Sequence, residues 1–180
     1  MKKISIALLA LALAACGNNG KYKVEIQKVD SLQNQLSLYH ARLDSVDQER
    51  LREMQPEINE LYDYLTENYP DSLDRRFWIN TLNQMVIVKK GTERYLANYE
   101  QLKGEMDYTG KQLADLENSL KDEKLESEKV QEYLRDEKQA VVEIEFFVNK
   151  LHGPARYAIS AWDTLHPQMQ SLADSLRALP

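Results

Sequence analysis

The sequence contains very few of the residues that break helices or cross-link chains. Among 180 residues there are six glycines, five prolines and a single cysteine, Cys16. One cysteine excludes an intramolecular disulfide and any zinc site built from clustered cysteines. The shortage of turn-forming residues, together with abundant Leu, Glu, Lys and Gln, is typical of long helices.

Motifs for catalysis are also missing. The sequence has no glycine-rich phosphate loop, no GxSxG and no HExxH. His40 and Asp44 have the i, i+4 spacing of two metal ligands on one helix face, but two ligands do not make a site. His152 and His166 could titrate near neutral pH without forming a catalytic group. We therefore predict a non-enzymatic protein with no catalytic residue, no cofactor and no metal.

Positive charge is scarce. Without Lys2 and Lys3, 21 basic residues stand against 29 acidic ones, which gives a net charge of −8. Such a surface repels phosphate backbones, so nucleic acid is excluded as a partner.

The first sixteen residues have the layout of an export signal. Two lysines are followed by an uncharged run over residues 4–15, which is shorter than the roughly 20 residues that a membrane-spanning helix needs. Leu13-Ala14-Ala15-Cys16 resembles the lipobox of bacterial lipoprotein precursors. The resemblance implies that residues 1–15 are removed as a signal peptide and that Cys16 carries acyl chains. Two or three such chains suffice for stable anchoring.

The residues after Cys16 bear on the destination of such a lipoprotein. Residues 16–21 would form the lipidated cysteine and a short tether. The resemblance implies delivery to the outer membrane, because Gly17 is not the aspartate associated with inner-membrane retention. No acidic cluster precedes Glu25. This favours a lipid-anchored protein that faces the periplasm.

A heptad repeat begins soon after the tether and predicts a first helix over residues 22–68. The spacing changes to steps of four between Arg50 and Ile58, which is a stutter, and Pro56 predicts a kink near residues 52–56. The apolar positions before the stutter are Val29, Leu32, Leu36, Tyr39, Leu43 and Val46.

A second repeat keeps one phase from Trp78 to Leu151, and 16 of its 22 positions are apolar. This continuity favours one long helix over residues 72–152, followed by a break at His152-Gly153-Pro154 and a last helix over 155–178. The positions after Trp78 are Thr81, Met85, Val88, Thr92, Tyr95, Tyr99, Leu102, Met106, Thr109, Leu113, Leu116, Leu120, Glu123, Ser127, Val130, Leu134, Glu137, Val141, Ile144, Val148 and Leu151.

These segments predict an all-α fold and one helical domain over residues 22–180. The favoured arrangement is a set of elongated, antiparallel, coiled-coil-like helical hairpins. The alternative is a compact four-helix bundle that breaks between Gly104 and Gly110, where lysine followed by glycine resembles a helix end. The repeat becomes polar over residues 119–127, which leaves a bend in this charged segment open.

Aromatic residues are the candidates for contact with a partner. Tyr62, Tyr69, Phe77 and Trp78 gather around the first predicted turn, and Trp162 lies after the second. Tyr and Trp dominate binding hot spots, although rings at these places also fill the ends of helical layers.

The functional hypothesis is a membrane-anchored envelope lipoprotein that acts as a structural or adaptor protein. Its helical seam would contact a partner protein or form a homo-oligomer. The alternative is a periplasmic ligand-binding or chaperone-like helical module.

Overall fold

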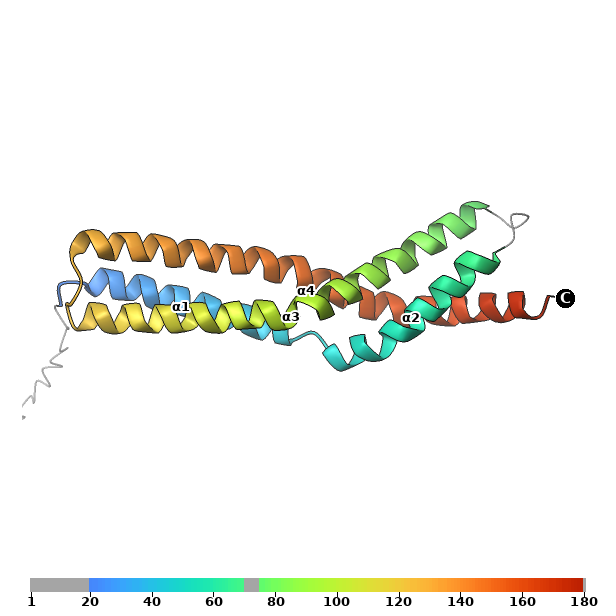
Figure 1. The fold of residues 1–180 in the computed structure, drawn as a ribbon, viewed down its shortest axis with the longest axis horizontal. Helices are drawn as coiled ribbons and strands as arrows, with labels where there is room; N and C mark the ends of the chain where they lie inside the picture. Colours follow the sequence, from blue (N-terminus) through green and yellow to red (C-terminus); the bar gives the residue numbers. More distant parts are fainter. Residues whose placement is uncertain (1–19, 70–74, 180) are drawn as a thin grey trace, which may run out of the picture.

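The computed structural model of the protein describes residues 20–69 and 75–179. Most of these residues lie in four helices, and the described part of the chain contains no strand (Figure 1). The prediction of an all-α fold is therefore confirmed. The helices are α1 (Lys23–Asp44), α2 (Gln48–Asn68), α3 (Arg75–Lys121) and α4 (Ser127–Arg177).

The helices form a rod with three helices in cross-section. α3 and α4 run along its whole length in opposite directions, while α1 and α2 follow one another along a single side (Figure 1). Both α1 and α2 pack against α3 and α4, but they do not contact each other. Because α4 has 51 residues, the rod is about 77 Å long.

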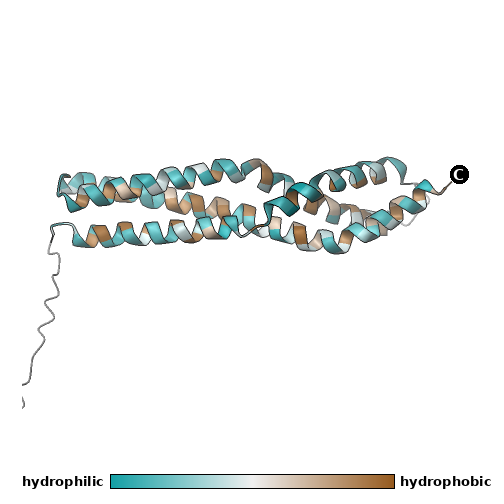
Figure 2. Cartoon of the chain, turned by 90° about the horizontal axis from the view of Figure 1, so that it is seen from below, coloured by the Kyte–Doolittle hydropathy of each residue, from teal (hydrophilic) through white to brown (hydrophobic). Residues whose placement is uncertain are grey.

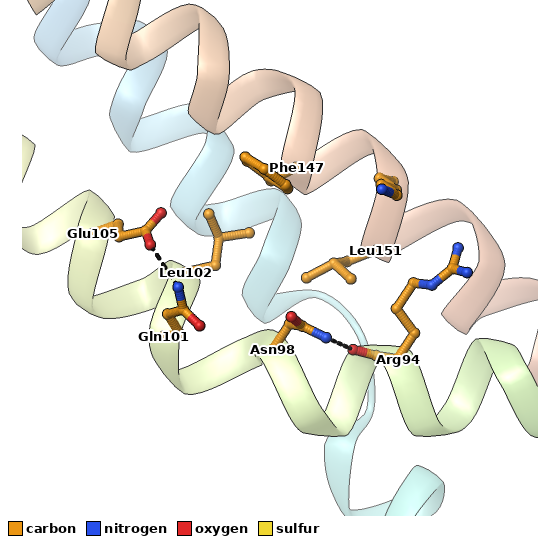
Figure 3. Close-up of a pocket in the computed structure, with 8 residues that line it drawn as sticks. Arg94, Asn98, Gln101, Leu102, Glu105, Phe147 and Leu151 are labelled. Carbon is orange, nitrogen blue, oxygen red and sulfur yellow. Dashed lines mark hydrogen bonds between the residues drawn. The ribbon is translucent and has the colours of Figure 1, made fainter.

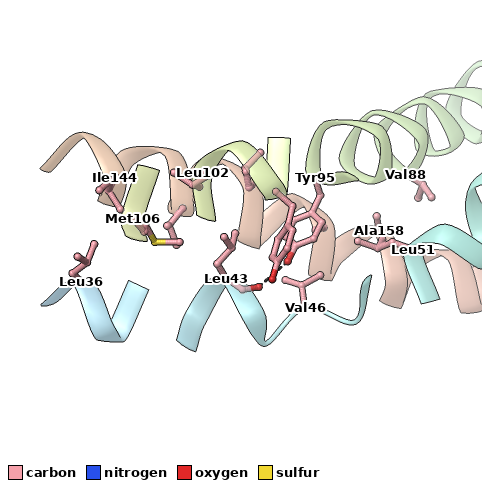
Figure 4. Packing of buried hydrophobic residues seen from close by; sticks show 14 of the residues in the cluster. Leu36, Leu43, Val46, Leu51, Val88, Tyr95, Leu102, Met106, Ile144 and Ala158 are labelled. Atoms are coloured by element: carbon pink, nitrogen blue, oxygen red, sulfur yellow. Dashed lines mark hydrogen bonds between the residues drawn. The ribbon is translucent and has the colours of Figure 1, made fainter. Parts of the chain in front are cut away.

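The predicted repeats supply the core. Apolar and polar residues are interspersed along each helix (Figure 2), and the apolar residues of the repeat are buried between the helices. Figure 4 shows side chains from three helices in each half of the rod, such as Leu36, Met106 and Ile144 in one half. In α3 every repeat position from Thr81 to Leu120 is buried. Burial of one leucine or methionine side chain contributes on the order of 2 kcal/mol.

The predicted single helix over residues 72–152 is wrong, because the chain reverses at residues 122–126. α3 ends in a Schellman motif: the Glu123 N–H donates to the Leu120 carbonyl and the Lys124 N–H to the Ser119 carbonyl, both at 3.1 Å. Glu123 occupies the left-handed position of this motif, with φ 53°. Glycine usually marks this position, so the sequence signal for the helix end is missing.

The repeat has the same phase before and after the reversal because of the number of residues in the turn, and not because one helix continues. Leu120 and Val130 are both buried, whereas Glu123 and Ser127 between them are exposed. The number of residues from Leu120 to Val130 equals a whole number of repeat steps, so the turn does not change the phase of the repeat. The predicted break between Gly104 and Gly110 is also wrong, since both glycines lie inside α3.

The predicted break at residues 152–154 is not present either, and the helix predicted over 155–178 is the second half of α4. α4 continues through both Pro154 and Pro167. At this point α3 and α4 approach closely: a Cβ on Gly91 would lie 2.8 Å from the Pro154 carbonyl oxygen and 3.3 Å from the Ala158 Cβ. The packing against Gly91 holds the backbone helical despite the donor that Pro154 removes.

The predicted first helix over residues 22–68 is broken at residues 45–47. Asp47 caps α2, because its side chain accepts a hydrogen bond from the Arg50 N–H at 2.9 Å. Pro56 lies inside α2 rather than at the break. The stutter in the repeat therefore follows a helix end that the sequence did not predict, and residues 52–56, where a kink was predicted, lie inside α2. Residues 70–74, which include the turn between the first two predicted helices, lie outside the described residues.

Candidate functional site

The two residues with metal-ligand spacing do not act together. His40 Nε2 lies 3.5 Å from Asp107 Oδ1 of α3. Asp44 instead accepts a hydrogen bond from the Tyr99 hydroxyl at 2.6 Å. Within residues 20–69 and 75–179, no three His, Cys, Asp or Glu side chains are grouped closely enough to hold a metal ion.

We call the junction between α1 and α2, residues 44–48, the waist. A cluster of polar side chains surrounds it. The buried Tyr95 hydroxyl donates to the Leu43 carbonyl at 2.7 Å, and this carbonyl at the end of α1 also accepts the Val46 N–H at 3.3 Å. Burial raises the pKa of Tyr95, so its hydroxyl stays protonated. Lys103 Nζ donates to the Tyr99 hydroxyl at 3.0 Å and lies 3.6 Å from Asp44. The hydrogen bonds of Tyr95 and Tyr99 and the contact of Lys103 with Asp44 join α1 to α3.

His152 lies on α4 and contacts residues at and beside the waist. Its Nδ1 accepts a long hydrogen bond from Arg42 Nε at 3.5 Å, and its Nε2 lies 3.3 Å from Ser45 Oγ. The Ser45 hydroxyl donates to the Arg42 carbonyl at 2.7 Å, so the imidazole carries its proton on Nε2. Burial, together with the charges of Arg42 and Arg156, lowers the pKa of His152. The polar groups of the waist are thus used in contacts between helices.

An open groove lies between α3 and α4 (Figure 3). Its volume is about 220 Å³, and the buried side chains of Leu102 and Leu151 form its floor. Phe147 forms part of its wall and is 44% exposed. The sequence did not indicate this groove, because the rim residues lie off the apolar repeat. The rim residues are Arg94, Asn98, Gln101, Glu105 and Lys150.

Three of the predicted contact residues gather at the end of the rod where α2 ends and α3 begins. The Tyr69 and Trp78 rings stack with centroids 4.1 Å apart. Phe77 is 51% exposed. Ile79 and Leu179 add exposed apolar surface to this end, which we call the distal end.

The other two predicted contact residues lie elsewhere. The Tyr62 ring is half-buried, with Lys89 Nζ 4.9 Å from its centroid. Trp162 is fully buried, and its ring lies 5.0 Å from the His166 ring. The prediction of Trp162 as a contact for a partner is therefore wrong. The reason is that α4 does not end near residue 153, so Trp162 occupies a core position of a continuous helix.

The first residues that the structure describes, Gly20 to Tyr22, form the N-terminal segment and lie at the opposite, proximal end of the rod. The Lys21 N–H donates to Glu123 Oε1 at 3.0 Å, and the Tyr22 hydroxyl donates to the Leu125 carbonyl at 2.5 Å. Gly20 therefore lies beside the turn between α3 and α4 (Figure 1). Cys16 itself lies outside the described residues. No helix in the described ranges is long and apolar enough to cross a membrane.

The chain matches no protein-family model, no curated protein and no solved structure.

Proposed function

We propose that the protein is a lipid-anchored envelope lipoprotein whose helical rod acts as a structural adaptor. The observation that carries the proposal is the separation of two features along the rod. The N-terminal segment leaves beside Glu123 and Leu125, whereas Phe77, Ile79 and Leu179 are exposed at the other end.

The anchor rests on the signal layout and on the lipobox-like sequence that ends at Cys16. Only four residue steps separate Cys16 from Gly20, and they span at most about 14 Å. An acylated Cys16 would therefore hold the proximal end of the rod close to the bilayer. Gly17 after the cysteine favours the outer membrane, with the rod in the periplasm.

The adaptor role is supported by how the side chains are used. The polar groups of the waist join helices to one another, and the groove between α3 and α4 is open. Exposed apolar side chains occur at the distal end and along the outer faces of α3 and α4, as with Ile87, Phe146 and Tyr157. A rigid rod with such surfaces is suited to contacting another protein, as coiled-coil adaptors do.

Site-specific photo-cross-linking in intact cells tests this role. A photoreactive residue replaces Ile79 at the distal end, where the side chain is 46% exposed. The matched control replaces Tyr133, which is 43% exposed and lies in the first turns of α4 near the proximal end. We expect one discrete cross-linked species from position 79 and none from position 133.

Two outcomes would contradict the adaptor. A broad smear of products from both positions would favour a chaperone-like module that holds many clients. The absence of any product from position 79 or other exposed positions would leave the rod without a partner.

A further inference from the structure

The outer side of the α3–α4 pair carries apolar surface that no helix covers. α1 and α2 pack on one side of this pair only. On the other side, the Phe147 ring lies against the Phe146 ring in an edge contact, with centroids 5.4 Å apart. Phe146 is 60% exposed and Phe147 is 44% exposed. Two adjacent exposed phenylalanines beside a groove with a leucine floor indicate a contact surface.

The charges on this surface follow an order along each helix. On α3 the rim reads Arg94, Asn98, Gln101, Glu105, with steps of four, three and four that place all four residues on one face. The cation comes first, the two amides follow, and the anion comes last. On α4 the order is reversed: Glu143 comes first, Phe147 follows, and Lys150 comes last.

None of these four charged groups forms an ion pair within the part of the chain that the structure describes. Glu105 accepts a hydrogen bond from Gln101 at 2.9 Å, and Glu143 accepts one from Gln139 at 2.8 Å. Lys150 Nζ lies 5.6 Å from the Phe146 ring centroid. All four residues are exposed, so they can meet charges on another molecule.

A second copy of the chain has the matching pattern. When two copies face each other with their rods antiparallel, α3 lies against α3 and α4 against α4. Arg94 then faces Glu105 of the second copy, the amides of Asn98 and Gln101 face each other, and Glu143 faces Lys150 of the second copy. Both pairings can form together, because Gln101 and Phe147 line the same groove and lie at one level of the rod.

We propose that the protein forms an antiparallel homodimer through the outer groove between α3 and α4. The centre of the dimer is a four-helix layer in which the Phe146 and Phe147 rings of the two copies cover one another. A two-fold axis requires each patch to match itself, and these rims do. In a parallel pair, a two-fold axis along the rod would place α3 against α4 of the second copy, which brings Arg94 near Lys150 and Glu105 near Glu143 and is repulsive.

The arrangement has a consequence for an anchored chain. In the antiparallel pair the two N-terminal segments leave from opposite ends. An anchored pair would therefore lie along one bilayer or join two facing ones. The dimer itself does not depend on acylation, since its contacts lie in the middle of α3 and α4.

The association state of the mature chain with Cys16→Ser tests the proposal without lipid. Sedimentation equilibrium should give twice the chain mass at micromolar concentration, with weaker association as salt screens the four charge pairs. Arg94→Glu and Glu105→Arg should each weaken association roughly tenfold or more, because each creates two like-charge contacts across the axis. The double variant R94E/E105R should return to within about threefold of the unchanged chain, since it restores opposite charges at both contacts.

Matched controls separate pairing from folding. Leu38→Ala changes a 68% exposed side chain on α1, away from the groove, and should leave the mass unchanged. Phe147→Ala should weaken pairing while the helical circular dichroism signal and melting temperature stay close to those of the unchanged chain. The double variant K150E/E143R exchanges the two charges on α4 and tests the second set of ion pairs in the same way.

A chain that stays monomeric up to about 100 µM overturns the proposal, because a dimer of cellular relevance forms well below that concentration. So does a dimer that Arg94→Glu leaves intact, or a double variant that fails to restore it. A monomeric chain in this assay would not contradict the proposed anchor and adaptor role. A Cys16 that carries no lipid in cells would not contradict the proposed dimer.

Discussion

At the scale of single residues, the rod depends on a few side chains that determine how closely the helices approach. Gly91 lets the backbones of α3 and α4 come together at Pro154, and Tyr95 donates to a carbonyl at the end of α1. His152 joins Arg42 and Ser45 across the waist as a neutral side chain. These three contacts lie where the two halves of the rod meet.

Gly91→Ala should destabilise the protein. The new Cβ would lie 2.8 Å from the Pro154 carbonyl oxygen, which is backbone and cannot move aside alone. Overpacking of this kind costs about 1–3 kcal/mol. Gly104→Ala is the matched control, because it is also inside α3 but has no atom within 4 Å of its Cβ position. It should stabilise by up to about 1 kcal/mol, since alanine is the better helix former. Urea unfolding measures both, and equal losses would show that close approach is not the cause.

The pH dependence of stability should report on His152. Its pKa in the folded chain lies below the ordinary value of 6.5, because of burial and the neighbouring Arg42 and Arg156. Above pH 7 the residue is neutral in both the folded and the unfolded chain, and its contribution is constant. As the pH falls from 6.5 towards the folded pKa, the unfolded chain takes up the proton before the folded chain does, so the free energy of unfolding decreases.

His152→Gln keeps a neutral hydrogen-bonding side chain but cannot titrate. The free energy of unfolding, measured in urea at pH 7.5 and 5.5, should fall more for the unchanged chain than for this variant. An identical loss in both chains would place the pH dependence elsewhere.

At the scale of the helices, the sequence identified which residues are buried far better than where helices end. Spacing by three and four is a local property, so Met85, Leu102 and Leu113 could be assigned to the core from the sequence. Helix ends depended on contacts from other segments. Glu123 ends α3 where glycine would be expected, and Gly153-Pro154 does not end α4 because Gly91 packs against it.

The same reason limited prediction of the candidate sites. Tyr69, Phe77 and Trp78 could be placed at one end because a proline-containing turn lies between them in sequence. Trp162 was misplaced by the predicted break that the structure lacks. The groove was missed because Arg94, Glu105 and Phe147 become neighbours only when α3 and α4 pair.

Glu123→Gly should stabilise the turn between α3 and α4. Glu123 has φ 53°, a conformation that costs a residue with a side chain roughly 1 kcal/mol and glycine little. We expect a gain of about 0.5–1 kcal/mol in urea unfolding, despite loss of the exposed bond from the Lys21 N–H. Asp122→Gly, next to it and outside the left-handed position, should give no such gain. If Glu123→Gly lowered the free energy of unfolding, the hydrogen bond from the Lys21 N–H would contribute more than the left-handed backbone conformation costs.

At the scale of the whole molecule, the proposed anchor and the two proposed contact surfaces lie at different places along the rod. The N-terminal segment leaves beside the turn between α3 and α4, and α4 extends about 77 Å from that turn. The distal end carries exposed aromatic and aliphatic side chains, and the middle carries the groove with its ordered charges. The proposed adaptor role depends on the proposed anchor, because an anchor at Cys16 would determine which surfaces reach a partner.

Metabolic labelling with an alkyne-tagged fatty acid, followed by membrane fractionation, tests the anchor most directly. The unchanged chain should carry the label and sediment with the outer membrane. The Cys16→Ser chain should lack the label and leave the membrane fraction, with its helical signal intact. An unlabelled natural chain, or a Cys16→Ser chain that still carries the label, would contradict the account.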